Sequence, residues 1–238
     1  MRLYNLPVIV LSISMSVMGG CNDDLGNQGD NTVYMTFQIE LNQQVYQDSS
    51  WADPPQMAIW LQNRNDRSVR TVFVTYRMGA CYWDGKVECS VALPYWTGFY
   101  NLETGTTGPP TWDKSAPDAV TCATPKTELN THIAVAEGSI WNYFIEVNVS
   151  GDYNAAFPSF SSDSRTDFYG NGQPSIVYRG TIEAIDGATS RPVLIGRTDQ
   201  HEPVTQIIEN TEGITTARQL LQSITISCRK DLECSESN

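Results

Sequence analysis

Side chains that commonly act as nucleophiles, general bases or metal ligands are few in this chain of 238 residues, which holds six cysteines and two histidines. With only His132 and His201, a histidine-rich metal site is not expected. The sequence has no Cys-x-x-Cys motif, no Gly-x-Ser-x-Gly elbow, no phosphate-binding loop and no His-Glu-x-x-His motif. These observations predict a protein without catalytic activity of its own and without a bound metal.

Cys21 follows a segment with the three parts of a secretory signal peptide. Residues 1–20 contain Arg2, the apolar run Leu6–Val17 and a closing pair of glycines. The apolar run is too short, and too interrupted by serine, to favour a membrane-spanning helix. We therefore expect the chain to be exported and residues 1–20 to be removed.

The sequence before Cys21 resembles the signal of bacterial lipoproteins, in which the cysteine is lipidated and becomes the first residue. Met18 stands where such signals usually carry leucine. The resemblance implies a lipid anchor on Cys21, and Asn22 after it favours sorting to the outer membrane. Ordinary secretion with cleavage near Gly20 is the alternative.

The other cysteines are candidates for disulfide bonds, because an exported chain reaches an oxidising compartment. Cys81 and Cys89 flank a short turn, and Cys228 and Cys234 flank a small terminal loop, so these two pairs are the candidate disulfides. Cys122 is left without a partner in this scheme, and the sequence does not fix the connectivity.

The charge of the chain limits its partners. It has 15 Lys and Arg against 27 Asp and Glu, a formal net charge of −12. Nucleic acid is therefore not an expected partner, since phosphate binding needs a basic face. Anionic lipid head groups would also be repelled, so the membrane link is expected to come from the lipid on Cys21, and the partner to be an unidentified envelope protein.

Three tryptophans in an irregular, aromatic stretch are candidate ligand-stacking residues: Trp83, Trp96 and Trp112. Aromatic side chains combine a large apolar face with a polar edge, which suits contact with a sugar or flavin ring. The same residues suit the packing of a loop onto a sheet, and we expect this structural role ahead of the carbohydrate-binding one.

Acidic side chains gather in a predicted loop, where Asp152, Asp163 and Asp167 lie near Glu146 and Asn148 in the sequence. Such oxygen atoms can ligate calcium, but the spacing of an EF-hand is absent. We interpret this segment as a solvated acidic loop.

Alternation of apolar and polar residues predicts a single β-domain over residues 32–238, joined to the anchor by a flexible tether at residues 21–31. Thr32–Leu41 alternates along its whole length, which is typical of a half-buried strand. A long loop is expected at residues 78–127, and a helix at 215–222. Further strands are predicted at residues 57–62, 69–77, 133–136, 141–149, 175–185, 192–195 and 223–227. This pattern predicts an all-β, two-sheet, immunoglobulin-like sandwich with long loops and one short C-terminal helix.

Four segments resemble the bacterial periplasmic family called domain of unknown function 2271. They read AIWLQNRNDRSVRTVFV, PDAVTCATP, IWNYFIEVNVSGDYN and GNGQPSIVYRGTI, within a resemblance that runs over Val33–Asp199. The strand–turn–strand segment is also similar to the immunoglobulin-like domain of flagellar hook-capping proteins. The resemblance implies an exported β-sandwich, often encoded near flavin-dependent electron-transfer components, with no enzymatic activity.

The segment Asp118–Thr124 is similar to the flavinylation sequence of FMN-binding domains, in which a transferase esterifies a threonine with FMN. The resemblance implies Thr124 as the acceptor and Asp118 as a recognition residue. Cys122 stands where the pattern has glycine, a position that can require positive φ, and Pro125 stiffens the next residue. The alternative is a plain turn between a loop and a strand.

The sequence as a whole favours an exported, lipid-anchored β-sandwich that acts as a non-catalytic interaction or accessory protein of the cell envelope, with no cofactor. Two other functions stay open. One is a flavin carrier in extracytoplasmic electron transfer, and the other is a carbohydrate-binding module.

Overall fold

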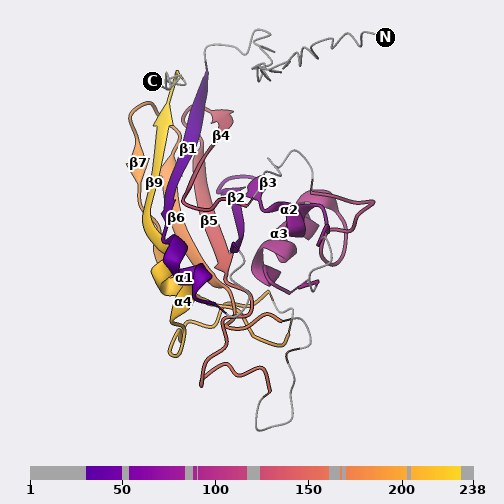
Figure 1. Ribbon diagram of the computed structural model, residues 1–238. Coiled ribbons are helices and arrows are strands. Elements are labelled where there is room, and N and C mark those ends of the chain that lie inside the picture. Colours follow the sequence, from indigo (N-terminus) through magenta and orange to yellow (C-terminus); the bar gives the residue numbers. More distant parts are fainter. Residues whose placement is uncertain are drawn as a thin grey trace, which may run out of the picture. The chain divides into compact units, whose positions relative to one another are not determined.

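The computed structural model describes most of the compact unit Asn31–Asn238 (Figure 1). The signal and most of the tether, residues 1–30 with Cys21, lie outside the described part, as do the candidate residues Asp118, Cys122, Asp163 and Cys234. The described residues are 31–49, 54–83, 88–89, 91–116, 124–160, 167, 170–202 and 205–231.

One antiparallel sheet has the strand order β4-β1-β9-β7. Its central strand β1 (Thr32–Leu41) pairs with β4 (Glu128–Ala136) on one side and β9 (Leu221–Arg229) on the other, and β7 (Thr189–Ser190) extends the edge. Every second residue of β1 is buried, as its alternating sequence predicts.

The second antiparallel sheet has the order β3-β2-β5-β6-β8. It consists of β3 (Val69–Val74), β2 (Gln56–Asn63), β5 (Ile140–Asn148), β6 (Ile176–Glu183) and β8 (Val193–Arg197).

Side chains from both sheets share one core, as the ring contact of Phe37 with Tyr143 shows, with centroids 6.0 Å apart. Strand makes up 40% of the chain and helix 14%, so the predicted all-β two-sheet sandwich is confirmed.

A helical layer covers the outer face of the second sheet, where a long loop was expected. The layer holds α2 (Tyr76–Gly79) and α3 (Pro94–Thr104), which lie on the side of β2 away from β1 in Figure 1. Its apolar side chains form a second core with Trp60 and Phe144, whose rings stack 5.2 Å apart. The prediction of a long loop at residues 78–127 was wrong over Pro94–Thr104, because tertiary burial of the aromatic side chains supports a helix of weak local propensity there.

Two further short helices lie side by side at one end of the sandwich (Figure 1). They are α1 (Gln43–Gln47), which follows β1, and α4 (Thr216–Leu220), which precedes β9. The C-terminal helix is confirmed, but it is shorter than predicted and is one of four in the described residues. None of the helices in the described part is long and apolar enough to cross a membrane.

Candidate functional site

A polar groove runs between α1 and α4, and we call it the α1–α4 groove. Its inner part has a volume of about 250 Å³ and its outer part about 310 Å³, and the two parts share four residues, Val45, Asp48, Thr215 and Thr216. The inner part is completed by Ser49, Asp152, Tyr153 and Gln173, and the outer part by Asn42, Gln44 and Gln219. The volume of the outer part is at the lower end of the range for small-molecule sites, and that of the inner part is just below it.

Gln173 holds the inner wall together, because its side chain bonds to two of the chain segments that form it. The side-chain Nε2 donates to the carbonyl oxygen of Asp152 at 2.7 Å and to Oγ1 of Thr216 at 2.6 Å. The side-chain Oε1 accepts from the backbone N–H of Thr215 at 2.6 Å. Gln173 is 2% exposed, so these bonds are shielded from water and fix the start of α4 against the loop after β5.

Asp152 places a buried carboxyl group in this wall. Its Oδ1 accepts a hydrogen bond from the backbone N–H of Gln173 at 2.8 Å, while Oδ2 is buried without a hydrogen-bond partner among the described residues. Burial raises the pKa of Asp152 to about 8, against the bonds from Gln173 and the Thr216 hydroxyl, which lower it. The carboxyl group is therefore largely protonated at neutral pH when the groove is empty.

A second carboxyl group, Asp167, lies behind Asp152. Its Oδ2 accepts from the backbone N–H of Gly172 at 2.8 Å. Gly172 has φ +74, and a Cβ there would meet Asp152, so the backbone fits between the two acids only as glycine. Burial, and then Asp167, raise the pKa of Tyr153, whose hydroxyl bonds to that carboxylate.

The prediction of a solvated acidic loop was wrong, because the described acidic side chains of this segment are buried. Asp152 is 5% exposed, and Glu146 and Asn148 are fully buried. The amide of Asn148 donates to Oδ1 of Asn171 at 2.7 Å. The described residues contain no group of three His, Cys, Asp or Glu side chains that could hold a metal ion.

Glu146 caps α3 rather than binding a ligand. Its two oxygens accept from the backbone N–H groups of Tyr95 at 3.3 Å and Trp96 at 2.7 Å, in the first turn of the helix. Ser175 donates its hydroxyl to the same carboxylate at 2.6 Å. Leu93 at the N-cap makes no side-chain cap bond, so Glu146 supplies the acceptor that the local sequence lacks.

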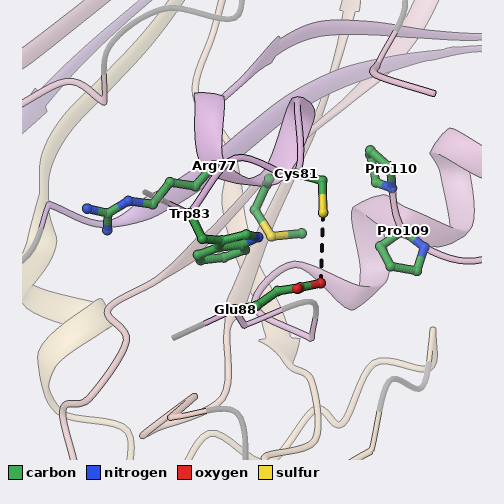
Figure 2. A pocket seen from close by; sticks show the side chains of 7 residues that line it. Arg77, Cys81, Trp83, Glu88, Pro109 and Pro110 are labelled. Carbon is green, nitrogen blue, oxygen red and sulfur yellow. Dashed lines mark hydrogen bonds between the residues drawn. The ribbon is translucent and has the colours of Figure 1, made fainter. Parts of the chain in front are cut away.

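The three candidate stacking tryptophans do not form one surface. Trp96 is fully buried and its Nε1 donates to Thr71 at 3.2 Å, so it cannot stack on a ligand. Trp112 is 84% exposed. Trp83 lines a hollow of about 10 Å³ beside Cys81 and Glu88 (Figure 2), which is room for no more than one water molecule.

The described cysteines are free thiols, so the predicted disulfide between Cys81 and Cys89 is absent. The Sγ of Cys81 points to Oε1 of Glu88 at 3.8 Å (Figure 2), whereas the Sγ of Cys89 is 3.9 Å from Oδ1 of Asn171 in the interior. Burial raises the pKa of Cys89 to about 12. Cys228 is also free and is buried in β9, and its predicted partner Cys234 is outside the described residues.

Thr124, the candidate FMN acceptor, is half-buried just before β4. Pro125 after it is buried, and the carbonyl oxygen of Lys126 accepts from the Tyr46 hydroxyl at 3.2 Å, which ties this segment to α1. Asp118, the candidate recognition residue, lies outside the described residues.

Sequence reasoning missed most of the α1–α4 groove. Of its lining residues only Asp152 was singled out, and Asp48, Gln173 and Thr216 carry no motif that would mark them. The polar run around Asp48 was one available signal, because it follows a strongly alternating strand.

No protein-family model, curated protein or solved structure matches this chain.

Proposed function

We propose that the protein is an exported, lipid-anchored β-sandwich that acts as a non-catalytic binding module of the cell envelope, with the α1–α4 groove as its binding site. The observation that carries this proposal is the construction of the groove. Polar side chains from separate chain segments converge there, and the buried amide of Gln173 fixes two of those segments in place.

The surroundings of the nucleophilic side chains support a non-catalytic role. Ser175 donates to Glu146, but both residues are fully buried and the carboxylate is occupied by the helix cap. Burial raises the pKa of the Cys81 thiol, and the Glu88 carboxylate raises it further, so the thiol stays protonated. A protonated thiol is a poor nucleophile.

The membrane localisation of the proposed module depends on acylation of Cys21. The acidic chain would not adhere to an anionic membrane by charge, so acylation must supply the attachment. We expect the wild-type protein in the membrane fraction and Cys21→Ala in the soluble fraction. Cys81→Ala is the matched control and should stay with the membrane, because Cys81 is a free internal thiol. An unacylated mature amino terminus would contradict the anchor.

Binding through the groove is tested by a photo-crosslinking amino acid in place of Gln219, which is exposed and lines the outer part. The matched position is Glu183, which is exposed on β6. In cells, a module that uses the groove forms an adduct with an envelope component from position 219 and not from 183. No adduct from 219, or equal adducts from both, would contradict the assignment of the groove.

The flavin-carrier function predicts a different result. Protein co-expressed with an FMN transferase would then be yellow, and Thr124→Ala would be colourless. We expect colourless protein of unmodified mass in both cases, because a transferase needs an accessible hydroxyl and Thr124 is half-buried.

A further inference from the structure

The inner part of the α1–α4 groove offers hydrogen-bond acceptors, because its donors are already used within the protein. Ser49 donates its hydroxyl to the carbonyl oxygen of Tyr46 at 2.7 Å, and Thr215 donates to Oε1 of Gln173 at 3.2 Å. The Tyr153 hydroxyl is bonded to Asp167. Both hydrogens of the Gln173 amide are also engaged, and the Thr216 hydroxyl, which accepts one of them, bonds in turn to the Asp152 carboxyl group. A ligand in this part must therefore bring its own donors.

The charges around the inner part have one sign. No Lys, Arg or His is among its lining residues, which include the carboxyl groups of Asp48 and Asp152. Asp48 is exposed and uses Oδ1 to accept from the Gln44 amide at 2.7 Å. The titratable groups that face Asp152 and Tyr153 among the described residues are the Asp167 carboxyl group and the Cys89 thiol, which is neutral because its pKa is raised to about 12, so no cation faces the site there. An anionic ligand would be repelled, and a cation attracted.

The unpaired Oδ2 of Asp152 is the second observation that points to a ligand. Asp152 is 5% exposed, and its Oδ2 is a buried acceptor without a partner among the described residues. Such an atom lowers the stability of the folded state unless a hydrogen-bond donor reaches it. The cost is tolerated where the group has a function. The other described acids of this region have protein donors, as Asp167 does from Gly172.

We propose that the inner part of the α1–α4 groove binds a primary ammonium group, with the carboxyl groups of Asp152 and Asp48 accepting its N–H donors. The inference rests on the proposed function, because it names what that binding site recognises. A primary ammonium carries three donors and one positive charge, which suits a wall whose two carboxyl groups act only as acceptors once Asp152 has lost its proton. A volume of about 250 Å³ admits the ammonium with a short alkyl chain.

The ammonium group can come from a free diamine or from a lysine side chain of a partner protein. A metal ion is a poorer occupant, because no third His, Cys, Asp or Glu joins the two carboxyl groups within the described residues. Calcium takes six to eight oxygen ligands, which this wall does not provide.

Protonation provides a direct signature of this binding. The empty site holds a proton on Asp152 below pH of about 8, and the bound ammonium requires the carboxylate. Binding at pH 7 therefore releases a proton, and affinity should rise about tenfold per pH unit below that pKa. The amine itself stays charged over this range, since its pKa is about 10.4.

The test is calorimetric titration of the purified protein with 1,4-diaminobutane and with Nα-acetyl-lysine amide at pH 6, 7 and 8. Titrations in two buffers of different ionisation enthalpy count the protons released. We expect binding that strengthens with pH and releases about one proton at pH 7. Binding of the diamine alone assigns a free amine, and binding of the lysine amide assigns a protein side chain.

Variants separate the site from other acidic surfaces. Asp152→Asn should abolish the proton release and weaken binding by at least tenfold, and Asp48→Asn should weaken binding while the proton release persists. Glu183→Gln, exposed on β6, should change neither. Asp48 is exposed, so its variant keeps the test valid even if Asp152→Asn fails to fold.

Three results would overturn the inference: no heat with either amine at pH 8, binding without pH dependence, or binding of calcium or a neutral sugar in place of the amines. Crosslinking from position 219 without amine binding would support the groove as a binding site and contradict only the ammonium ligand. The absence of both crosslinking and amine binding would contradict the assignment of the groove as a binding site.

Discussion

Glu146 holds a helix in place from the centre of the molecule, at a position where a carboxyl group looks functional in the sequence. Burial raises its pKa to about 7, although hydrogen bonds from Ser175, Trp96 and Tyr95 lower it. Its three donors come from residues 29 to 51 positions away. A perturbed pKa is common at active sites, but here the same perturbation arises from a structural cap.

Truncation of this residue tests its role. Glu146→Ala leaves two backbone N–H groups of α3 and the Ser175 hydroxyl without their acceptor, and it opens a cavity. We expect the free energy of unfolding to fall by about 2–4 kcal/mol. Glu183→Ala, exposed on the neighbouring strand, should change it by less than about 0.5 kcal/mol. Chemical denaturation measures both, and equal losses would contradict the capping role.

At the scale of elements, strands β2 and β5 contribute side chains to both hydrophobic cores, because both of their faces are covered. Met57, Ile59 and Leu61 face the core between the sheets, while Ala58 and Trp60 face the helical layer. Alternation disappears from such a strand, which becomes apolar at successive positions. The apolar run of β2 is therefore explained by its two covered faces.

A glycine in β6 makes a second prediction at this scale. Gly180 lies directly opposite Tyr143 of β5, and a Cβ at Gly180 would clash with the Tyr143 ring. That ring packs against Phe37 and its hydroxyl meets the Ser190 hydroxyl at 2.8 Å, so it has little freedom to move.

We expect Gly180→Ala to destabilise the protein by about 1–3 kcal/mol, because the ring must shift within a packed core. Arg179→Ala, on the exposed side of the same strand, is the control and should cost much less. Thermal unfolding of the two variants measures the loss of stability that each substitution causes. A stable Gly180→Ala would show that the two strands can separate there without loss.

The whole molecule should lose stability as the pH rises from about 5 to about 8. Glu146 and Asp152 have folded-state pKa values raised to about 7 and about 8, both mainly by burial. In the unfolded chain each group ionises near pH 4, so between these values the folded state binds more protons. Stability then falls by up to about 1.4 kcal/mol per pH unit for each group.

Urea denaturation at pH 5, 6, 7 and 8 measures this dependence. The net charge of −12 acts in the same direction, since self-repulsion grows as the acids ionise. Glu146→Gln and Asp152→Asn should each flatten the curve, because neither amide titrates. A wild-type stability that rises over this range would contradict the assignment of both buried carboxyl groups.

Much of the sandwich could be predicted from the sequence, and much of the groove could not. The strand at Thr32–Leu41 was found with its bounds, because one covered face imposes a period of two. The helix α3 was missed, because Gly98 and a run of aromatic residues weaken its local signal. The disulfide between Cys81 and Cys89 was wrong, because closeness in sequence does not fix the direction of the side chains.

By itself, the sequence determined the all-β class, the positions of most strands and the acidic charge, because each depends on residues that are adjacent or on composition. The tertiary structure alone decided that Glu146 caps α3 and that Asp152 lies in the wall of a groove between α1 and α4. Both depend on contacts between residues far apart in the chain, as in the bond from Gln173 to Thr216 across 43 positions. Burial then sets the charge state of these carboxyl groups, and burial is a property of the packed chain.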